Sequence, residues 1–119
     1  MNVSSVTDFY RVTPELLINW PAALQRIGAT IDPDNRSTRK ARTMTGLPCG
    51  RASMGEQWAD IWSIMVDPES IVKRDLPPHM FSGPNMHVTY DKRHASFGDL
   101  VQKCLLANGA ELVVSYNRE

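Results

Sequence analysis

The sequence predicts a small single domain of the α+β class that comprises residues 1–119. A chain of 119 residues has the usual length of one domain, and its 42% hydrophobic and 22% charged residues are ordinary for a globular protein. Neither a linker nor a change in composition divides the chain. Because segments with strand and with helix periodicity alternate, we expect three to five short strands in one sheet, with about four helices packed largely on one face.

The N-terminal quarter predicts a strand followed by a helix. Residues 6–12 are rich in β-branched and aromatic side chains, which favour a strand. Thr13, Pro14 and Glu15 then supply a capping hydroxyl, a proline at the first helical position and a carboxylate at the positive end of the helix dipole. Since an internal proline removes a helical hydrogen bond, Pro21 is expected to kink or split this helix. Its apolar face comprises Leu16, Leu17, Trp20, Leu24 and Ile27.

The middle of the chain combines an irregular segment with a strong helical pattern. Residues 29–31 predict a brief strand, residues 32–35 a turn, and residues 42–45 the arm of a hairpin. Ser53 and Glu56 have the spacing of a capping box, so we expect a central core helix to begin at Ser53. Its apolar face would carry Trp58, Ile61, Trp62 and Met65, which recur at helical spacing.

The C-terminal part predicts a βαβ unit. A short helix is expected over residues 67–75, followed by a loop over residues 79–85. Residues 86–90 and 112–116 then predict two strands. Such a unit favours a right-handed crossover, and a ferredoxin-like sheet is one arrangement compatible with this order. The helix between the strands can be capped by Ser96, carries Phe97, Leu100, Val101, Cys104 and Leu105 on one face, and ends at Asn108 and Gly109.

Charge, apolar runs and cysteines bear on the compartment. The chain has 13 basic and 13 acidic residues, so its net charge gives no reason to expect a polyanion or a membrane as partner. The N-terminus has no signal-peptide pattern, and no apolar stretch approaches the roughly 20 residues that span a bilayer. Cys49 and Cys104 lie far apart, which favours reduced thiols over a disulfide framework. We therefore expect a cytoplasmic protein.

The sharpest local feature is a basic segment at residues 36–51, which contains no acidic residue. Arginine forks suit phosphate oxygens, so the segment is a hypothetical binding site for a nucleic-acid backbone or another phosphorylated ligand. The alternative is a solvated surface loop whose charge nearby carboxylates neutralise. The candidate anion-binding residues are Arg36, Arg39, Lys40, Arg42 and Arg51.

Candidate catalytic groups are scattered along the chain. Cys49 lies between arginines and shortly before the expected helix at Ser53, which would favour a nucleophilic thiolate, although an ordinary free thiol is the alternative. His87 could act as an acid or base with a nearby aspartate, or be an ordinary strand residue. The spacing of His79, His87 and His94 does not fit a metal site, so we predict neither a metal nor a cofactor.

Two further groups are candidates for binding. Trp20, Trp58 and Trp62 could line a ligand pocket, but their helical spacing favours packing in the core. The segment that follows the paired prolines offers a surface for a protein partner or for self-association, with a loop folded onto the core as the alternative. The candidate partner-binding residues are Pro78, His79, Met80 and Phe81.

These observations favour a non-enzymatic binding or interaction module, because no catalytic constellation can be identified in so short a chain. A protein partner or a second copy of the chain is the first expectation. Nucleic acid bound through residues 36–51 is a further member of the same class. The alternative is a small enzyme with a pocket near Trp58, Cys49 and His87.

Overall fold

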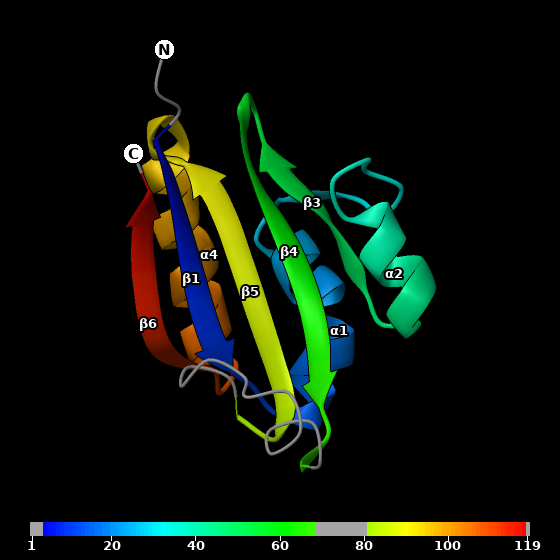
Figure 1. Ribbon diagram of the computed structural model, residues 1–119. Helices are drawn as coiled ribbons and strands as arrows, with labels where there is room; N and C mark the ends of the chain where they lie inside the picture. The colour runs from blue at the N-terminus through cyan, green and yellow to red at the C-terminus, as the bar shows by residue number, and fades with distance from the viewer. Residues whose placement is uncertain (1–3, 69–80, 119) are drawn as a thin grey trace.

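The computed structural model describes residues 4–68 and 81–118. These residues form one six-stranded sheet in the order β2-β3-β4-β5-β1-β6, in which every neighbouring pair is antiparallel. Figure 1 shows α1 and α4 behind this sheet and α2 beside its β3 edge. The prediction of an α+β fold is confirmed. The described residues contain six strands, where three to five were predicted, and three α-helices, where about four were predicted.

The elements have the following bounds. The strands are β1 (Ser5–Arg11), β2 (Thr30–Asp32), β3 (Cys49–Met54), β4 (Gln57–Val66), β5 (Gly83–Asp91) and β6 (Glu111–Arg118). The helices are α1 (Pro14–Arg26), α2 (Arg39–Thr45) and α4 (Ala95–Ala107), with the 3-10 turn η1 (Lys92–His94) before α4.

Four of the strands and two helices follow the ferredoxin-like order. Strands β1, β4, β5 and β6 are linked by α1 and α4 in the sequence βαββαβ and lie side by side as β4-β5-β1-β6. The predicted C-terminal βαβ unit is therefore present in its split form, because β5 and β6 run parallel with β1 between them. The segment β2-α2-β3 is an addition that widens the sheet beyond β4.

The hydrophobic core lies between the sheet and the two helices behind it. Alternate side chains of β1, β4 and β5 point into it, which leaves the other alternate set on the opposite face of the sheet. The buried core residues are Val6 and Tyr10 of β1, Ala59 and Ile61 of β4, Met86 and Val88 of β5, Leu17, Trp20 and Leu24 of α1, and Phe97, Val101 and Leu105 of α4.

Helix α1 runs as one helix through Pro21, so the expected split is wrong. Pro21 has no N–H to give to the carbonyl of Leu17, but the hydroxyl of Ser63 in β4 donates to that carbonyl at 2.7 Å. The same hydroxyl accepts from Trp20 Nε1 at 2.9 Å, and the carbonyl of Pro48 also accepts from this N–H at 3.2 Å. Tertiary hydrogen bonds thus satisfy the group that the proline leaves unpaired.

The core helix expected from Ser53 is also wrong, because this segment is a β-hairpin. Strands β3 and β4 pair from Cys49 opposite Trp62 to Met54 opposite Gln57, and Gly55 takes a left-handed φ of 64° in the turn between them. Strand β4 lies inside the sheet and has apolar residues on both faces. Residues i and i+4 lie on the same face of a strand as well as of a helix, so the spacing of Trp58 and Trp62 fits both structures.

The remaining expectations had mixed outcomes. Strands β1, β2, β5 and β6 and helix α4 confirm the predicted elements at those places, but the cap of α4 is His94 rather than Ser96, and Gln57 Oε1 accepts from the N–H of Phe97 at 2.8 Å. Residues 42–45 belong to α2 instead of a hairpin arm, and the predicted loop before β5 already becomes strand at Gly83. The short helix expected over residues 67–75 lies largely outside the described residues.

Replacing Ser63 by Ala should destabilise the protein by about 1–3 kcal/mol, because the buried carbonyl of Leu17 would lose its donor. Chemical denaturation measures this loss. The double variant with Pro21→Ala is the decisive comparison: alanine restores an N–H for Leu17, so Ser63→Ala should cost about 1 kcal/mol less in that background. An equal cost in both backgrounds would show that the proline and the serine are not coupled. The exposed Ser37→Ala serves as control.

Candidate functional site

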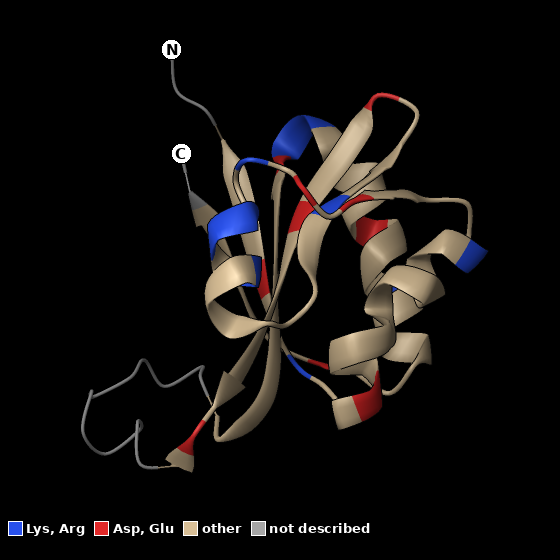
Figure 2. Ribbon diagram, turned by 90° about the vertical axis from the view of Figure 1, so that its right-hand side faces the viewer, with Lys and Arg blue, Asp and Glu red and all other residues tan. Residues whose placement is uncertain are grey.

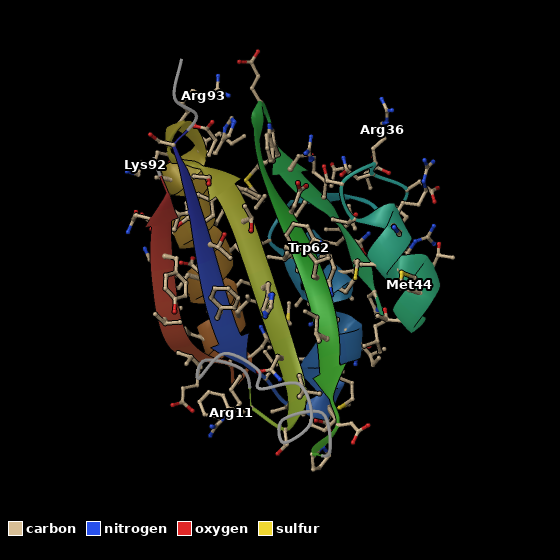
Figure 3. The ribbon with its side chains drawn as sticks, viewed as in Figure 1. Arg11, Arg36, Met44, Trp62, Lys92 and Arg93 are labelled. Carbon is tan, nitrogen blue, oxygen red and sulfur yellow. The ribbon has the colours of Figure 1, made fainter. Side chains whose placement is uncertain are left out.

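The face of the sheet opposite α1 and α4 is the candidate site, and we call it the uncovered face. Strand register places its side chains in rows that cross the strands. In Figure 3 Trp62 lies near the middle of this face. One row consists of Cys49, Trp62, His87, Phe9 and Val114. The next row consists of Arg51, Asp60, Thr89, Thr7 and Tyr116.

Aromatic rings dominate the first row and its neighbours. The rings of Phe9 and His87 meet edge to face with centroids 4.2 Å apart, and Phe9 meets Tyr116 in the same manner at 5.5 Å. Phe9, His87 and Trp62 are partly exposed, and Tyr116 is 50% exposed. The uncovered face therefore presents several rings to solvent, although two of its tryptophans were expected in the core.

An ion pair fixes one end of this aromatic surface. Arg51 donates to both carboxylate oxygens of Asp60 at 2.7 and 3.1 Å, and its guanidinium lies 3.7 Å from the centre of the Trp58 ring. The bidentate contact with Asp60 raises the pKa of Arg51, which stays charged. Asp60 is buried, so this pair is better shielded from solvent than a surface salt bridge. Arg51 thus holds Trp58 in place and has its charge already balanced.

The basic segment predicted from sequence divides into two groups. Arg42 is paired with Asp34 through Nη2 alone at 2.7 Å, whereas Arg51 is held by both carboxylate oxygens of Asp60. Arg36, Arg39 and Lys40 are exposed, and the described residues give them no ion-pair partner. In Figure 2 the ribbon of α2, with its blue segments, lies on the opposite side of the sheet from α1, which is the side of the uncovered face.

More cations border the same face elsewhere. Figure 3 shows Lys92 and Arg93 at one end of the sheet, Arg11 at the other end and Arg36 near α2. Arg93 is paired with Asp91 at 3.2 Å, while the guanidinium of Arg11 lies 3.9 Å from the centre of the Phe81 ring. Aromatic residues thus occupy the middle of the face and basic residues its border.

Of the predicted partner-binding segment, the structure describes Phe81. Pro78, His79 and Met80 lie outside the described residues. Phe81 is described and is partly buried under Arg11, and Asn85 Nδ2 donates to its carbonyl at 2.7 Å. This end of the segment is therefore folded against β1 and β5.

The groups of the alternative enzyme hypothesis do not converge on one pocket. Cys49 and His87 lie on either side of Trp62 in one row, so two strand spacings, or roughly 10 Å, separate their backbones. Trp58 lies in β4 as well, four residues before Trp62. Burial raises the pKa of the Cys49 thiol, which disfavours the thiolate. A cavity beside Cys49 is lined by neither histidine nor carboxylate.

The described residues also offer no cluster of three or more histidine, cysteine or acidic side chains that could hold a metal ion. His94 packs against Trp58 with ring centroids 5.2 Å apart, and His87 packs against Phe9. Cys49 and Cys104 are buried and free.

Sequence reasoning missed a buried polar cluster on the core side of the sheet. Asp8 is only 2% exposed and accepts a hydrogen bond from the hydroxyl of Ser115. Burial raises its pKa, and burial together with the Asp8 charge raises the pKa of Tyr90 to about 12. Tyr90 also lies tightly against α4, where a Cβ on Gly98 would fall 2.4 Å from its ring. The alternation of β1 puts Asp8 on the same face as the buried Val6 and Tyr10, and this pattern could have predicted a buried carboxylate.

Comparisons with known proteins supply no further assignment, because no family model, curated protein or solved structure matches this chain. None of the helices in the described residues combines the length and the apolar character needed to cross a membrane.

Replacing Asp8 by Asn should make the protein more stable at pH 7. The folded state raises the pKa of Asp8 above its ordinary value of 3.8, so it holds the proton more tightly than the unfolded chain. The stability due to the protonated acid is complete below pH 3.8 and is lost as the pH rises through the folded pKa. Asparagine avoids this loss and can still accept from Ser115.

Denaturation of Asp8→Asn and wild type at several pH values measures the effect. The advantage of the variant should shrink as the pH falls towards 3.8. Glu56→Gln, at an exposed turn residue, is the control and should show little difference. A variant less stable than wild type at pH 7 would show that hydrogen bonds to the ionised carboxylate outweigh its burial.

Proposed function

We propose that this protein is a non-enzymatic binding module whose uncovered face binds single-stranded nucleic acid. The observation that carries the proposal is the row of partly exposed rings on that face, next to a helix with unpaired cations. Trp62, His87 and Phe9 lie on three adjacent strands, and Tyr116 follows on a fourth. The enzyme alternative has no comparable support.

The rings match the chemistry of unpaired bases. Every base has a flat π-face, and stacking on an aromatic side chain contributes about 1–3 kcal/mol per base without requiring a particular sequence. Adjacent strands of a sheet lie roughly 4.8 Å apart, so the rings within one row offer successive positions along an extended strand of nucleotides. Bases in a duplex are stacked on each other and cannot use such a surface, which favours single strands.

The cations match the phosphate backbone. Arg36, Arg39 and Lys40 are exposed on the side of the uncovered face, and Asp34 and Asp60 are engaged by other arginines. The net charge of zero therefore hides a local excess of positive charge. Contacts of this kind release counterions and make the affinity fall with salt.

Self-association is a second candidate, supported by the outer strand β6. Among the described strands β6 is an edge strand of eight residues, and such an edge can pair with that of a second copy. Tyr116 on β6 and Leu106 on the neighbouring α4 are 50% and 42% exposed. The solution mass, measured by light scattering, tests this candidate: a monomer at all concentrations rejects it.

A cytoplasmic location belongs to the same proposal. Two free, buried cysteines are compatible with a reducing compartment. Fractionation of cells that make the protein would reject this location if the chain were recovered outside the cytoplasm.

Binding to random-sequence single-stranded DNA and RNA across a salt series tests the nucleic-acid proposal. Trp62→Ala should weaken binding by about 1–3 kcal/mol and leave the salt dependence unchanged, because it removes stacking and no charge. The triple variant Arg36→Ala, Arg39→Ala and Lys40→Ala should instead lower the slope of log affinity against log salt by about 2, since each phosphate contact on a single strand contributes about 0.7.

The matched control for the charge variant is Arg26→Ala with Lys103→Ala, which removes exposed cations from α1 and α4. This variant should bind like wild type. Absence of binding at low salt would reject the proposal, and so would duplex DNA that binds as tightly as single strands. A loss in the control about two-thirds as large as that in the triple variant, in proportion to the two and three charges removed, would show only a non-specific effect of net charge.

A further inference from the structure

A separate cavity opens at the edge of the sheet, where α1, α2 and the start of β3 meet. Its volume is about 240 Å³. Helix α1 contributes one wall, and the segments around β2 and before β3 contribute the others. The lining residues are Trp20, Pro21, Gln25, Ile31, Pro33, Arg42, Pro48 and Cys49. Except for Arg42 and Cys49, none of them belongs to the residues proposed from sequence as an anion site or a catalytic site.

The walls of this cavity are mainly apolar and stiff. Three prolines and Ile31 supply flat or branched apolar surface, and proline rings have little freedom to collapse into the space. The indole N–H of Trp20 is already bonded to Ser63 and Pro48, so this residue presents ring carbon to the cavity. Apolar walls with a few polar groups are the usual composition of a small-molecule site.

The polar groups of the cavity favour an anion. Arg42 is the charged residue on its wall, and no carboxylate is among the lining residues. Asp34 accepts from Arg42 Nη2 at 2.7 Å, but the Nε–H of Arg42 is buried and has no hydrogen-bond partner. A buried donor without a partner is rare in a native protein and calls for a water or an ion that completes it. A carboxylate that enters the cavity would contact the guanidinium of Arg42, whose side chain is 37% exposed, and would compete with Asp34 for its N–H groups.

We propose that this cavity binds a small monoanion in which one aromatic ring carries a carboxylate. The volume of about 240 Å³ lies just below the roughly 300–1,000 Å³ of pockets for drug-sized ligands, which suits a single substituted ring. The ring would lie against Trp20 and the prolines, and the carboxylate would accept from the guanidinium of Arg42. Cys49 is common to this cavity and to the first row of the uncovered face, but neither proposal uses its thiol, so either proposal can fail alone.

Titration of the ¹⁵N-labelled protein with benzoate tests the site, with benzyl alcohol as the uncharged probe of similar shape. Benzoate should shift the indole N–H signal of Trp20 in the NMR spectrum. The indole signals of Trp58 and Trp62, on the uncovered face, are internal controls and should not move. Benzoate that leaves the Trp20 signal unchanged, or shifts all three indoles alike, would overturn the proposal.

Variants separate the charge from the shape. Arg42→Met should weaken benzoate binding about ten- to hundredfold and change benzyl alcohol binding by less than about twofold, because only the carboxylate uses the guanidinium. Arg39→Met is the matched control: it removes a cation from the same helix at a residue that does not line the cavity, and should leave benzoate binding intact. Equal affinities of Arg42→Met and wild type for benzoate would overturn the role of Arg42.

Two further variants keep the test valid if loss of Arg42 disturbs α2. Asp34→Asn retains Arg42 but removes the carboxylate that competes for it, so benzoate should bind more tightly than to wild type. Gln25→Phe places a bulky ring at an exposed lining residue and should abolish binding of both probes. Unchanged binding by the Gln25 variant would place the ligand elsewhere and overturn the site.

Discussion

The hydroxyl of Ser63 is the contact on which the arrangement of this protein depends. It donates to the carbonyl that Pro21 leaves without a partner and accepts from the indole of Trp20, so a single buried group joins α1 to the inner strand β4. The indole also reaches the carbonyl of Pro48, which fixes the chain just before β3. Buried polar groups are costly unless they are paired, so this small network permits one position of α1 over the sheet.

Helices α1 and α4 both pack on one face of the sheet, so they leave the side chains of the other face uncovered. Strand β4 carries apolar residues on both faces, with Ala59 and Ile61 in the core and Trp62 on the uncovered face. Large rings outside the core add little to stability when they remain partly exposed, which makes them candidates for recognition. Helix α2 lies at the border of this face, and its Arg42 lines the cavity beside Trp20.

Local sequence signals predicted α1, α4, β5 and β6 well but failed at β3 and β4. A capping hydroxyl at Thr13, an apolar stripe on α4 and strict alternation in β5 act within a few residues, and the tertiary packing at these places agrees with them. In β4 the spacing of Trp58 and Trp62 fits a helix and a strand equally. The pairing of β4 with β3 and β5, together with the turn at Gly55, decided between them.

The candidate site was predictable in composition and not in geometry. The sequence by itself determined an α+β chain with two amphipathic helices, free cysteines and a basic segment around Arg39, because these follow from periodicity and residue type. Only the tertiary structure decided that Asp34 and Asp60 neutralise Arg42 and Arg51, and that Phe9, His87 and Trp62 share one row. The reason is physical: both ion pairs form across a turn of the folded backbone, eight and nine residues apart, and sheet register joins strands far apart in the chain, so no local pattern records which partner is chosen.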